Sequence, residues 1–384
     1  MSELILSGLS RKYPKYQYST DKMIEILGNK LSKNTIENIK QLGVNNRYFV
    51  KPFEHYLTNT KSTDIFAEDY VEPISDLTKE VALDCLDNLG INKNEITCLV
   101  SASENSDYLS PGLSSLLVRK IGMSNFIPHF NIQGMACSTL PKLLELGKSL
   151  VKNEDDKVLV VISGANSGWY LPHLKDNMAI KNPKEIGKDQ YNKEKQMKKW
   201  VSTMFSFLFG DGAVAFVLSG KKIGQHGIKI GKISHAVNFS DADYKHACVR
   251  MIHQYTNNLY EYELTAGHDV LNRSLEYSKK VLCELKDMDE FNENKASEYM
   301  KNMKKVMIHT GSLKILDGFK KLYNLDENQI KESYETLQEF GNLTGCSIPT
   351  VLEKSFSDMN PTERGLLIGI TMGFGLDMVE IEKV

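Results

Sequence analysis

The segment FNIQGMACSTLPKLLELGKSL, residues 130–150, contains an apolar stretch that ends at Cys137, directly before an amphipathic helical pattern. One face at helical spacing carries Leu140, Leu143, Leu144, Leu150 and Val151, and the other carries Lys142, Glu145 and Lys148. Pro141 lies in the first turn of this helix, where its missing N–H group would have no intrahelical partner. The segment therefore predicts a strand, a sharp turn that carries Cys137, and a helix.

The position of Cys137 favours a reactive thiol. The positive end of a helix dipole stabilises a thiolate, and so lowers the pKa of a cysteine at a helix N-terminus. The alternative is a buried, unreactive cysteine, because free cysteines are among the most buried residues in proteins. The segment by itself leaves both interpretations open.

Composition and charge narrow the possible classes of protein. The 384 residues are enough for two core units or for one large duplicated α/β unit. The chain has 47 Lys and Arg residues against 49 Asp and Glu residues, a balance that gives no reason to expect a nucleic acid or an anionic membrane as a partner. Its six cysteines are scattered without a CxxC pair, so we expect neither a disulfide framework nor a metal site.

The beginning of the chain, MSELILSGLSRKYP, lacks the hydrophobic core of a signal peptide. Apolar runs elsewhere in the chain are shorter than a membrane-spanning helix requires. We therefore expect a cytoplasmic protein without a membrane span.

Continuous apolar runs separated by helical patterns indicate mainly parallel sheets covered on both faces, and hence an α/β fold. These runs are ITCLVSAS (96–103), FIPHFNIQ (126–133), KVLVVISG (157–164), GAVAFVLSG (212–220), KKVMIHT (304–310) and RGLLIGITMGFG (364–375). The polar, lysine-rich segment 171–200 interrupts this pattern. We expect it to be an inserted surface excursion whose lysines are either solvated or bind phosphate.

A second strand-to-helix junction carries His309, which follows the run KKVMIHT and precedes an amphipathic helical pattern. Two similar halves, each with a reactive side chain at the end of a strand, would bring Cys137 and His309 together at the seam where α/β proteins build their sites. Asn342, after Gly341 and before another helical pattern, is a third candidate. Taken singly, a core histidine and a turn or cap asparagine are the simpler interpretations. The matching contexts favour a site.

This set of side chains suits the chemistry of thioesters. A thiolate at Cys137 would take an acyl group from a thioester. Decarboxylation of a malonyl thioester would then supply a carbanion, provided that donors stabilise the enolate oxygen. The Nε2–H group of His309 and the amide of Asn342 are suitable donors, and His309 could also hold Cys137 in a thiolate–imidazolium pair. The scheme requires no metal and no redox cofactor, and it makes Cys137 the most reactive of the six thiols.

Seven segments carry motifs in a fixed order along the chain. They are GVNNRYFVKPFEHYL (43–57), YLSPGLSSLLVRKIG (108–122), GMACST (134–139), SFLFGDGAVAFVLSG (206–220), HTGSLKILDGF (309–319), EFGNLTGCSIPTVLE (339–353) and MGFGLDMVEIEKV (372–384). Together they resemble the thiolase superfamily and its decarboxylating condensing enzymes, above all bacterial type III polyketide synthases of the chalcone synthase kind, with ketoacyl synthase III as a near relative. The resemblance implies Cys137 as the acyl acceptor, with His309 and Asn342 as the decarboxylation and oxyanion pair.

The resemblance also implies a duplicated thiolase fold of five layers, αβαβα. Residues 1–222 would form the half that carries the nucleophile and the excursion, and residues 223–384 the half that carries His309 and Asn342. We expect a homodimer whose two-fold interface includes residues 100–125 and the strand before Cys137. The implied substrates are acyl-CoA and malonyl-CoA, with acyl carrier protein as an alternative donor.

Two departures from the family pattern leave the starter, the number of extensions and the cyclisation open. Thr310, Gly311 and Ser312 follow the histidine where the family has a proline and two glycines. Leu376 stands in the C-terminal loop where the family has a proline followed by a glycine. The family's aromatic gatekeeper has no assigned counterpart in the excursion 171–200.

Glu104, in SASENSDYLS, lies where the polyketide synthases carry a small hydroxyl residue. The non-decarboxylating relative 3-hydroxy-3-methylglutaryl-CoA synthase has its acid/base glutamate in a similar context, and the alternative is a surface carboxylate. Because loss of carbon dioxide makes the carbanion directly, we expect that Glu104 is not the base that forms it. Glu104 would instead orient an acyl chain or a water molecule.

The leading hypothesis is thus an acyltransferase that performs decarboxylative condensation through an acyl-Cys137 intermediate, like a type III polyketide synthase. The alternatives are a 3-hydroxy-3-methylglutaryl-CoA synthase-like condensation that uses Glu104, a single condensation like that of ketoacyl synthase III, and an inactive scaffold that binds acyl thioesters or a partner enzyme.

Overall fold

The computed structural model describes residues 3–58, 71–176, 178–186, 190–239, 247–251, 262–266, 270–371 and 375–384. Nine strands form one sheet in the order β11-β12-β13-β8-β1-β7-β6-β4-β5. Their bounds are β1 (Ile5–Lys12), β4 (Cys98–Ser103), β5 (His129–Ile132), β6 (Lys157–Ala165), β7 (Asp211–Ser219), β8 (Gly227–Val237), β11 (Lys305–Ile308), β12 (Arg364–Thr371) and β13 (Gly375–Lys383). The first five in this series of nine lie before residue 222 and the other four after it, and the two groups meet where β1 pairs with β8.

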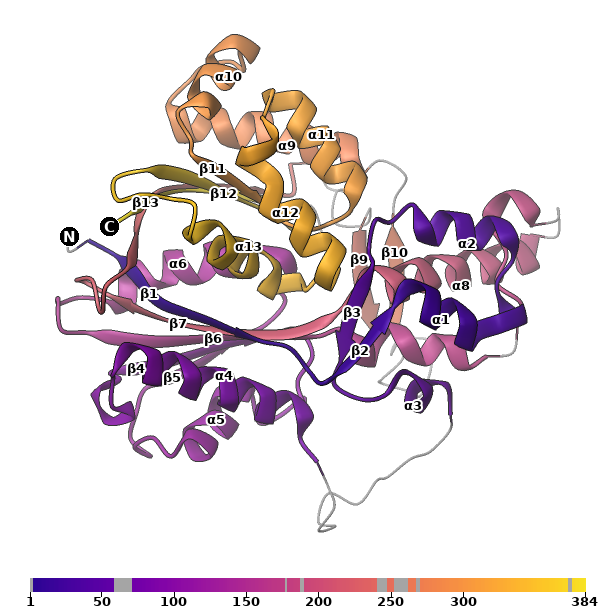
Figure 1. Ribbon diagram of the computed structural model, residues 1–384, viewed down its shortest axis with the longest axis horizontal. Helices are drawn as coiled ribbons and strands as arrows, with labels where there is room; N and C mark the ends of the chain where they lie inside the picture. The colour runs from indigo at the N-terminus through magenta and orange to yellow at the C-terminus, as the bar shows by residue number, and fades with distance from the viewer. Residues whose placement is uncertain are drawn as a thin grey trace.

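Helices cover this sheet in three layers (Figure 1). One outer face carries α4 (Pro73–Leu89) and α5 (Leu113–Ile121), and the opposite outer face carries α9 (Val270–Lys286) and α11 (Leu313–Tyr323). Between the two groups of strands lie α6 (Thr139–Leu150) and α13 (Ser347–Phe356), which contact strands of both groups. The layers therefore follow the expected order αβαβα.

The strand directions differ from the expectation of a mainly parallel sheet. Parallel pairing joins β4 to β5 and β6, and β11 to β12. The β1–β7, β6–β7, β1–β8, β8–β13 and β12–β13 pairs are antiparallel. The expectation was wrong because a strand covered by helices on both faces is a continuous apolar run whatever its direction.

The remaining elements build a lobe beside the sheet and the helical cover of β11 (Figure 1). They are β2 (Tyr16–Ser19), α1 (Thr20–Leu27), α2 (Lys33–Lys40), β3 (Asn46–Phe49), α3 (Phe53–Leu57), α7 (Ser167–Tyr170), α8 (Gln190–Leu208), β9 (Ala247–Met251), β10 (Tyr262–Ala266), α10 (Glu293–Lys301) and α12 (Glu327–Phe340).

The segment 171–200 is not the inserted surface excursion that we expected. Leu171, Leu174 and Ile180 are buried in one cluster with Met23 and Leu31 of the N-terminal region, and the segment continues into α8. Periodicity misses such packing because these partners are distant in sequence and the apolar positions are irregularly spaced. The segment thus forms part of a small core of its own.

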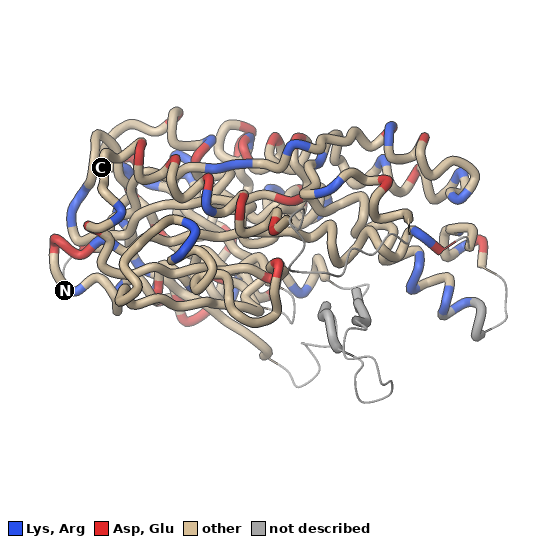
Figure 2. Tube along the Cα trace, turned by 90° about the horizontal axis from the view of Figure 1, so that it is seen from below, with Lys and Arg blue, Asp and Glu red and all other residues tan. Residues whose placement is uncertain are grey.

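Acidic and basic residues are interspersed along the described part of the chain, as the colours in Figure 2 show, in keeping with 47 basic and 49 acidic residues in the full sequence. Within the described residues, no helix is long and apolar enough to cross a membrane.

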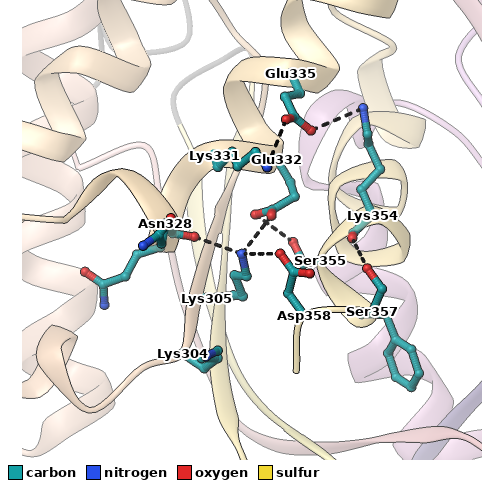
Figure 3. A network of polar contacts seen from close by, with 12 residues as sticks. Lys304, Lys305, Asn328, Lys331, Glu332, Glu335, Lys354, Ser355, Ser357 and Asp358 are labelled. Atoms are coloured by element: carbon teal, nitrogen blue, oxygen red, sulfur yellow. Dashed lines mark hydrogen bonds and ion pairs between the residues drawn. The ribbon is translucent and has the colours of Figure 1, made fainter. Parts of the chain in front are cut away.

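A buried ion pair ties β11 to the helices beside it (Figure 3). Lys305, whose exposed fraction is 2%, places Nζ 2.7 Å from Oε1 of Glu332 and 3.2 Å from Oδ2 of Asp358. It also donates to the carbonyl of Asn328 at 2.9 Å. This cluster and an adjacent polar cavity of about 1060 Å³ lie at the end of β11 opposite His309.

Candidate active site

Cys137 lies in a single 3₁₀ turn, η3 (Ala136–Ser138), between β5 and α6. The predicted strand, turn and helix are therefore confirmed, with Pro141 in the first turn of α6. Ala136 has a φ of 42°, in the left-handed region that non-glycine residues seldom adopt. The Cys137 side chain is buried, with an exposed fraction of 6%.

Backbone hydrogen bonds hold His309 against β12 and Asn342 against the end of α8 and the loop that follows it. His309 directly follows β11, and its backbone N–H group donates to the carbonyl of Ile368 in β12 at 2.9 Å. Asn342 donates its backbone N–H to the carbonyl of Leu208 at 2.8 Å, and its own carbonyl accepts from the N–H of Gly210 at 3.1 Å. Both side chains are buried.

The structure brings the three predicted residues together. Nδ2 of Asn342 lies 3.3 Å from Nε2 of His309, and the Asn342 side chain also hydrogen-bonds Cys137. Oδ1 of Asn342 accepts the backbone N–H of Thr344 at 2.8 Å, which turns the amide NH₂ group towards the imidazole. Because an NH₂ group can only donate, Nε2 is the acceptor and the ring proton lies on Nδ1.

Burial opposes the charged forms of the two reactive side chains. Burial, and secondly the negative charge of Glu104, raise the pKa of the Cys137 thiol well above its ordinary value, against a hydrogen bond from Asn342. Burial lowers the pKa of His309 to about 3. Desolvation therefore favours a neutral thiol and a neutral imidazole in the free protein, and the expected thiolate–imidazolium pair stays a prediction.

Glu104 is not the surface carboxylate that we had considered. It follows β4, is half-buried, and accepts backbone N–H groups from the loop before Cys137. Oε1 accepts from Ala136 at 2.6 Å and Oε2 accepts from Gly134 at 3.2 Å. Burial raises the pKa of Glu104, and these backbone hydrogen bonds oppose the rise.

Two buried residues near the site were missed by the sequence analysis. Burial, and secondly the negative charges of ionised Cys137 and Glu104, raise the pKa of Tyr170. The Tyr170 ring packs against Phe209, with ring centroids 4.7 Å apart and an angle of 31° between the ring planes. The aromatic pair in SGWYLP, directly after β6, is the signal that could have drawn attention to it.

Asp211, the second missed residue, stands in the otherwise apolar run GDGAVAFVLSG. Its carboxylate accepts the backbone N–H groups of Ser167 and Val50, each at 2.9 Å. Burial raises the pKa of Asp211 to about 6. The residue thus fixes the turn after β6, which carries Tyr170, against the start of β7.

No protein-family model matches the chain. Curated proteins with similar sequences are ketoacyl-[acyl-carrier-protein] synthases III. The enzyme of Vesicomyosocius okutanii is 25% identical over 318 residues, covering 81% of this chain and 84% of that protein. The enzyme of Campylobacter fetus is 24% identical over 321 residues, covering 79% of this chain and 81% of that protein.

Solved structures of type III polyketide synthases share the fold over nearly the whole chain. CsyB in complex with CoA-SH superposes with a TM-score of 0.77 at 17% identity and covers 99% of this chain and 100% of its own. The 1,3,6,8-tetrahydroxynaphthalene synthase of Streptomyces coelicolor gives a TM-score of 0.74 at 18% identity, with 98% of each chain covered.

The predicted thiolase fold is therefore confirmed, whereas the boundary between residues 222 and 223 remains a prediction. The chain is thus similar in sequence to ketoacyl synthases III and shares its fold with type III polyketide synthases, and both are condensing enzymes.

Proposed function

We propose that the protein condenses an acyl thioester starter with malonyl-CoA through an acyl-Cys137 intermediate, in the manner of a type III polyketide synthase. The observation that carries this proposal is the contact of His309 with Asn342 beside Cys137, at 3.3 Å between Nε2 and Nδ2. The solved complex of CsyB with CoA-SH supports CoA thioesters as the substrate class.

In the first half-reaction the thiol of Cys137 attacks the carbonyl of the acyl thioester. Because Nε2 of His309 is unprotonated in this arrangement, it is the base that can take the thiol proton as the new carbon–sulfur bond forms. The bond to the CoA sulfur breaks, and CoA leaves as a thiolate that takes its proton from water. The protonated Nε2 is then a donor, whereas before this step it was an acceptor.

In the second half-reaction malonyl-CoA loses carbon dioxide. The electron pair of the broken carbon–carbon bond passes into an enolate. The Nδ2–H group of Asn342 and the Nε2–H group of His309 converge from adjacent positions, so one enolate oxygen can accept from both. The enolate carbon attacks the acyl carbonyl on Cys137. The carbon–carbon bond forms, the bond to Cys137 sulfur breaks, and a β-ketoacyl-CoA results. The Cys137 sulfur then takes back the proton from Nε2 of His309, which restores the free enzyme.

A single condensation of the ketoacyl synthase III type is the second candidate function. The observation that favours it is the sequence similarity to these synthases over about four fifths of the chain, 81% in one case. The two functions share both half-reactions and differ in the number of extensions and in the extender's carrier. An inactive scaffold is not favoured, because the complete set of Cys137, His309 and Asn342 is assembled.

A 3-hydroxy-3-methylglutaryl-CoA synthase-like reaction is disfavoured by the contacts of Glu104. Its two carboxylate oxygens already accept N–H groups of Gly134 and Ala136, whereas a base must reach the acetyl methyl group of a substrate.

The test is intact-mass analysis after incubation with a panel of acyl-CoAs, followed by malonyl-CoA or malonyl carrier protein and identification of the products. We expect an acyl adduct on the wild-type protein and on Cys283→Ala, a matched control in α9, but none on Cys137→Ala. An adduct that persists in Cys137→Ala would contradict the proposal. Condensation of acetyl-CoA with acetoacetyl-CoA in the absence of any malonyl thioester would do so too.

A further inference from the structure

The loop that leads into Cys137 has an unusual backbone. Gly134 has a φ of 81°, Met135 has φ −92° and ψ −10°, and Ala136 has a φ of 42°. The three residues thus alternate between left-handed, right-handed and left-handed conformations. Such alternation turns successive N–H groups towards one side of the chain and forms an anion-binding concavity, or nest.

The anion in this nest is a side chain of the protein itself. The Glu104 carboxylate accepts from Ala136 at 2.6 Å and from Gly134 at 3.2 Å, and the N–H group of Met135 also hydrogen-bonds it. The amide of Gln133 donates to the backbone carbonyl of Glu104 at 3.4 Å, which adds a second tie between the two loops. Three successive N–H groups therefore converge on one carboxylate.

Ala136 needs such support because it carries a Cβ in the left-handed region. That conformation is unfavourable for a residue other than glycine, and it persists only where the surroundings stabilise it. Ala136 directly precedes Cys137, so its backbone conformation sets the direction from which the thiol meets a substrate.

The second half of the molecule contains a similar turn, in which a side-chain oxygen also accepts the N–H group of a residue with positive φ. The 3₁₀ turn η7 (Thr344–Cys346) leads into α13 as η3 leads into α6, and Thr344 has a φ of 51°. The N–H group of Thr344 donates to Oδ1 of Asn342 at 2.8 Å. In each turn, a non-glycine residue with positive φ is therefore held by a side-chain oxygen, an amide in one half and a carboxylate in the other.

From these contacts we propose that Glu104 is a positioning residue: its carboxylate fills the nest of residues 134–136 and holds the Cys137 turn in the conformation that accepts an acyl group. This inference deepens the proposed function and rests on the role of Cys137 as acyl acceptor. It assigns to Glu104 neither proton abstraction from a substrate nor contact with an acyl chain.

The negative charge of the Glu104 carboxylate should affect the pKa of the Cys137 thiol, which can be measured. The titratable groups that face the Glu104 carboxylate are Cys137 from η3 and Tyr170 from α7, and its negative charge raises the pKa of each. Removing the charge should favour the thiolate of Cys137, although it loosens the turn. Removing the charge should therefore slow acylation of Cys137 in one assay and make alkylation of Cys137 easier at lower pH in the other.

The first experiment measures both effects in Glu104→Gln, which keeps one acceptor oxygen but places an NH₂ group against a backbone N–H. Single-turnover acylation of Cys137 by an acyl-CoA should slow by roughly ten- to a hundredfold, the scale for displacing a reacting group by up to about 1 Å. The pH profile of Cys137 alkylation by iodoacetamide should instead move to lower pH. Glu95→Gln is the matched control, because the Glu95 carboxylate also accepts a backbone N–H, from Asn92 at 2.9 Å, in a different loop.

The second experiment introduces Ala136→Gly, which removes the Cβ that makes the left-handed conformation costly. Acylation in the double variant Glu104→Gln/Ala136→Gly should be faster than in Glu104→Gln alone. Such rescue separates positioning from general unfolding, because a second glycine does not repair an unfolded protein.

Two outcomes would overturn the inference: wild-type acylation in Glu104→Gln, or an unchanged alkylation profile. Wild-type acylation combined with loss of condensation would show the behaviour of a base. If the wild-type protein accepts no acyl group at all, the proposed function fails, whereas the alkylation profile still tests whether the carboxylate lies in the nest.

Discussion

The amide of Asn342 and the imidazole of His309 meet at 3.3 Å, between Nδ2 and Nε2, although 32 residues separate them in the chain. Thr344 fixes the orientation of the amide through its backbone N–H, so the NH₂ group faces the imidazole. A substrate oxygen placed between these nitrogens would accept from both, provided that Nε2 carries a proton. The pair is therefore suited to an oxygen that becomes negative during the reaction.

Replacing this pair should separate the two half-reactions. We expect Asn342→Ala to slow malonyl-CoA decarboxylation by a factor of roughly a hundred to a thousand, the usual cost of one oxyanion donor. Acyl-enzyme should still form in this variant, because the base is His309. Carbon dioxide release and intact mass measure the two steps, and decarboxylation at the wild-type rate would refute the role of Asn342.

The reactivity of Cys137 should rise with pH. Burial and the Glu104 charge raise the pKa of its thiol, and a raised pKa means that the thiolate forms only above the ordinary pH range of cysteine. Cys283, on α9, is only partly buried. In the free protein at neutral pH we therefore expect iodoacetamide to label Cys283 before Cys137, contrary to the sequence-based expectation.

Peptide mapping of alkylated protein at about pH 7 and pH 9 tests this order. Preincubation with an accepted acyl-CoA should protect Cys137 and leave Cys283 reactive. Rapid labelling of Cys137 at neutral pH would show that its thiol ionises despite burial.

Asp211 should make the stability of the protein depend on pH. Its folded-state pKa is about 6, above the ordinary value of 3.8, so the folded state binds the proton more tightly than the unfolded state. This contribution is fully present below about pH 4 and is lost as pH rises through about 6, on the order of 3 kcal/mol in all. Urea unfolding across this range should show the advantage of wild type over Asp211→Asn shrinking as pH rises. A constant difference would refute the raised pKa.

The Lys305–Glu332 pair should matter more when one partner is removed than when both are (Figure 3). Glu332→Ala leaves the buried ammonium with less compensation and should destabilise the fold by roughly 3–5 kcal/mol, whereas Lys305→Met/Glu332→Leu should cost much less. Lys331→Ala is the control, because the Lys331–Glu335 pair is exposed on α12 and its loss should cost below about 0.5 kcal/mol. Equal losses in single and double variants would contradict this account.

The proposed homodimer should depend on the edge formed by β5. This strand ends the sheet, and Phe130 within it and Phe126 before it are 46% and 96% exposed. An exposed apolar edge strand is a ready surface for a second chain. We expect Phe130→Asp to sediment as a monomer at concentrations where wild type and Lys222→Asp, in the turn between β7 and β8, sediment as dimers. A monomeric wild type would refute the assembly.

The sequence predicted those parts of the site that local periodicity and chain order determine. The turn at Cys137 follows from an apolar run next to an amphipathic helix, and the position of His309 follows from the matching strand-to-helix junction. The raised pKa of Cys137 could not be foreseen, because it depends on burial by residues distant in the chain. The contact of Glu104 depends on the alternating backbone of residues 134–136, which composition does not encode.

The terminal loop at residues 372–374, which belongs to the C-terminal motif, lies outside the described residues. The direction of the strands and the packing of residues 171–200 were misjudged for a common reason. Burial on both faces removes the alternation that would reveal strand orientation, and irregular apolar positions conceal contacts with a remote segment.

The backbone N–H of Asn342 is bonded to Leu208 at the end of α8 and its carbonyl to Gly210 in the following loop, independently of its side chain. Any residue with a backbone N–H group that replaces Asn342 can form the same two backbone hydrogen bonds and so take the same position between the two halves of the molecule. In an evolutionary lineage, the chemistry at this point could therefore change by single substitutions while the architecture is inherited intact. Because backbone position and side-chain chemistry are independent here, one ancestral fold can give rise to different reactions without a change of fold.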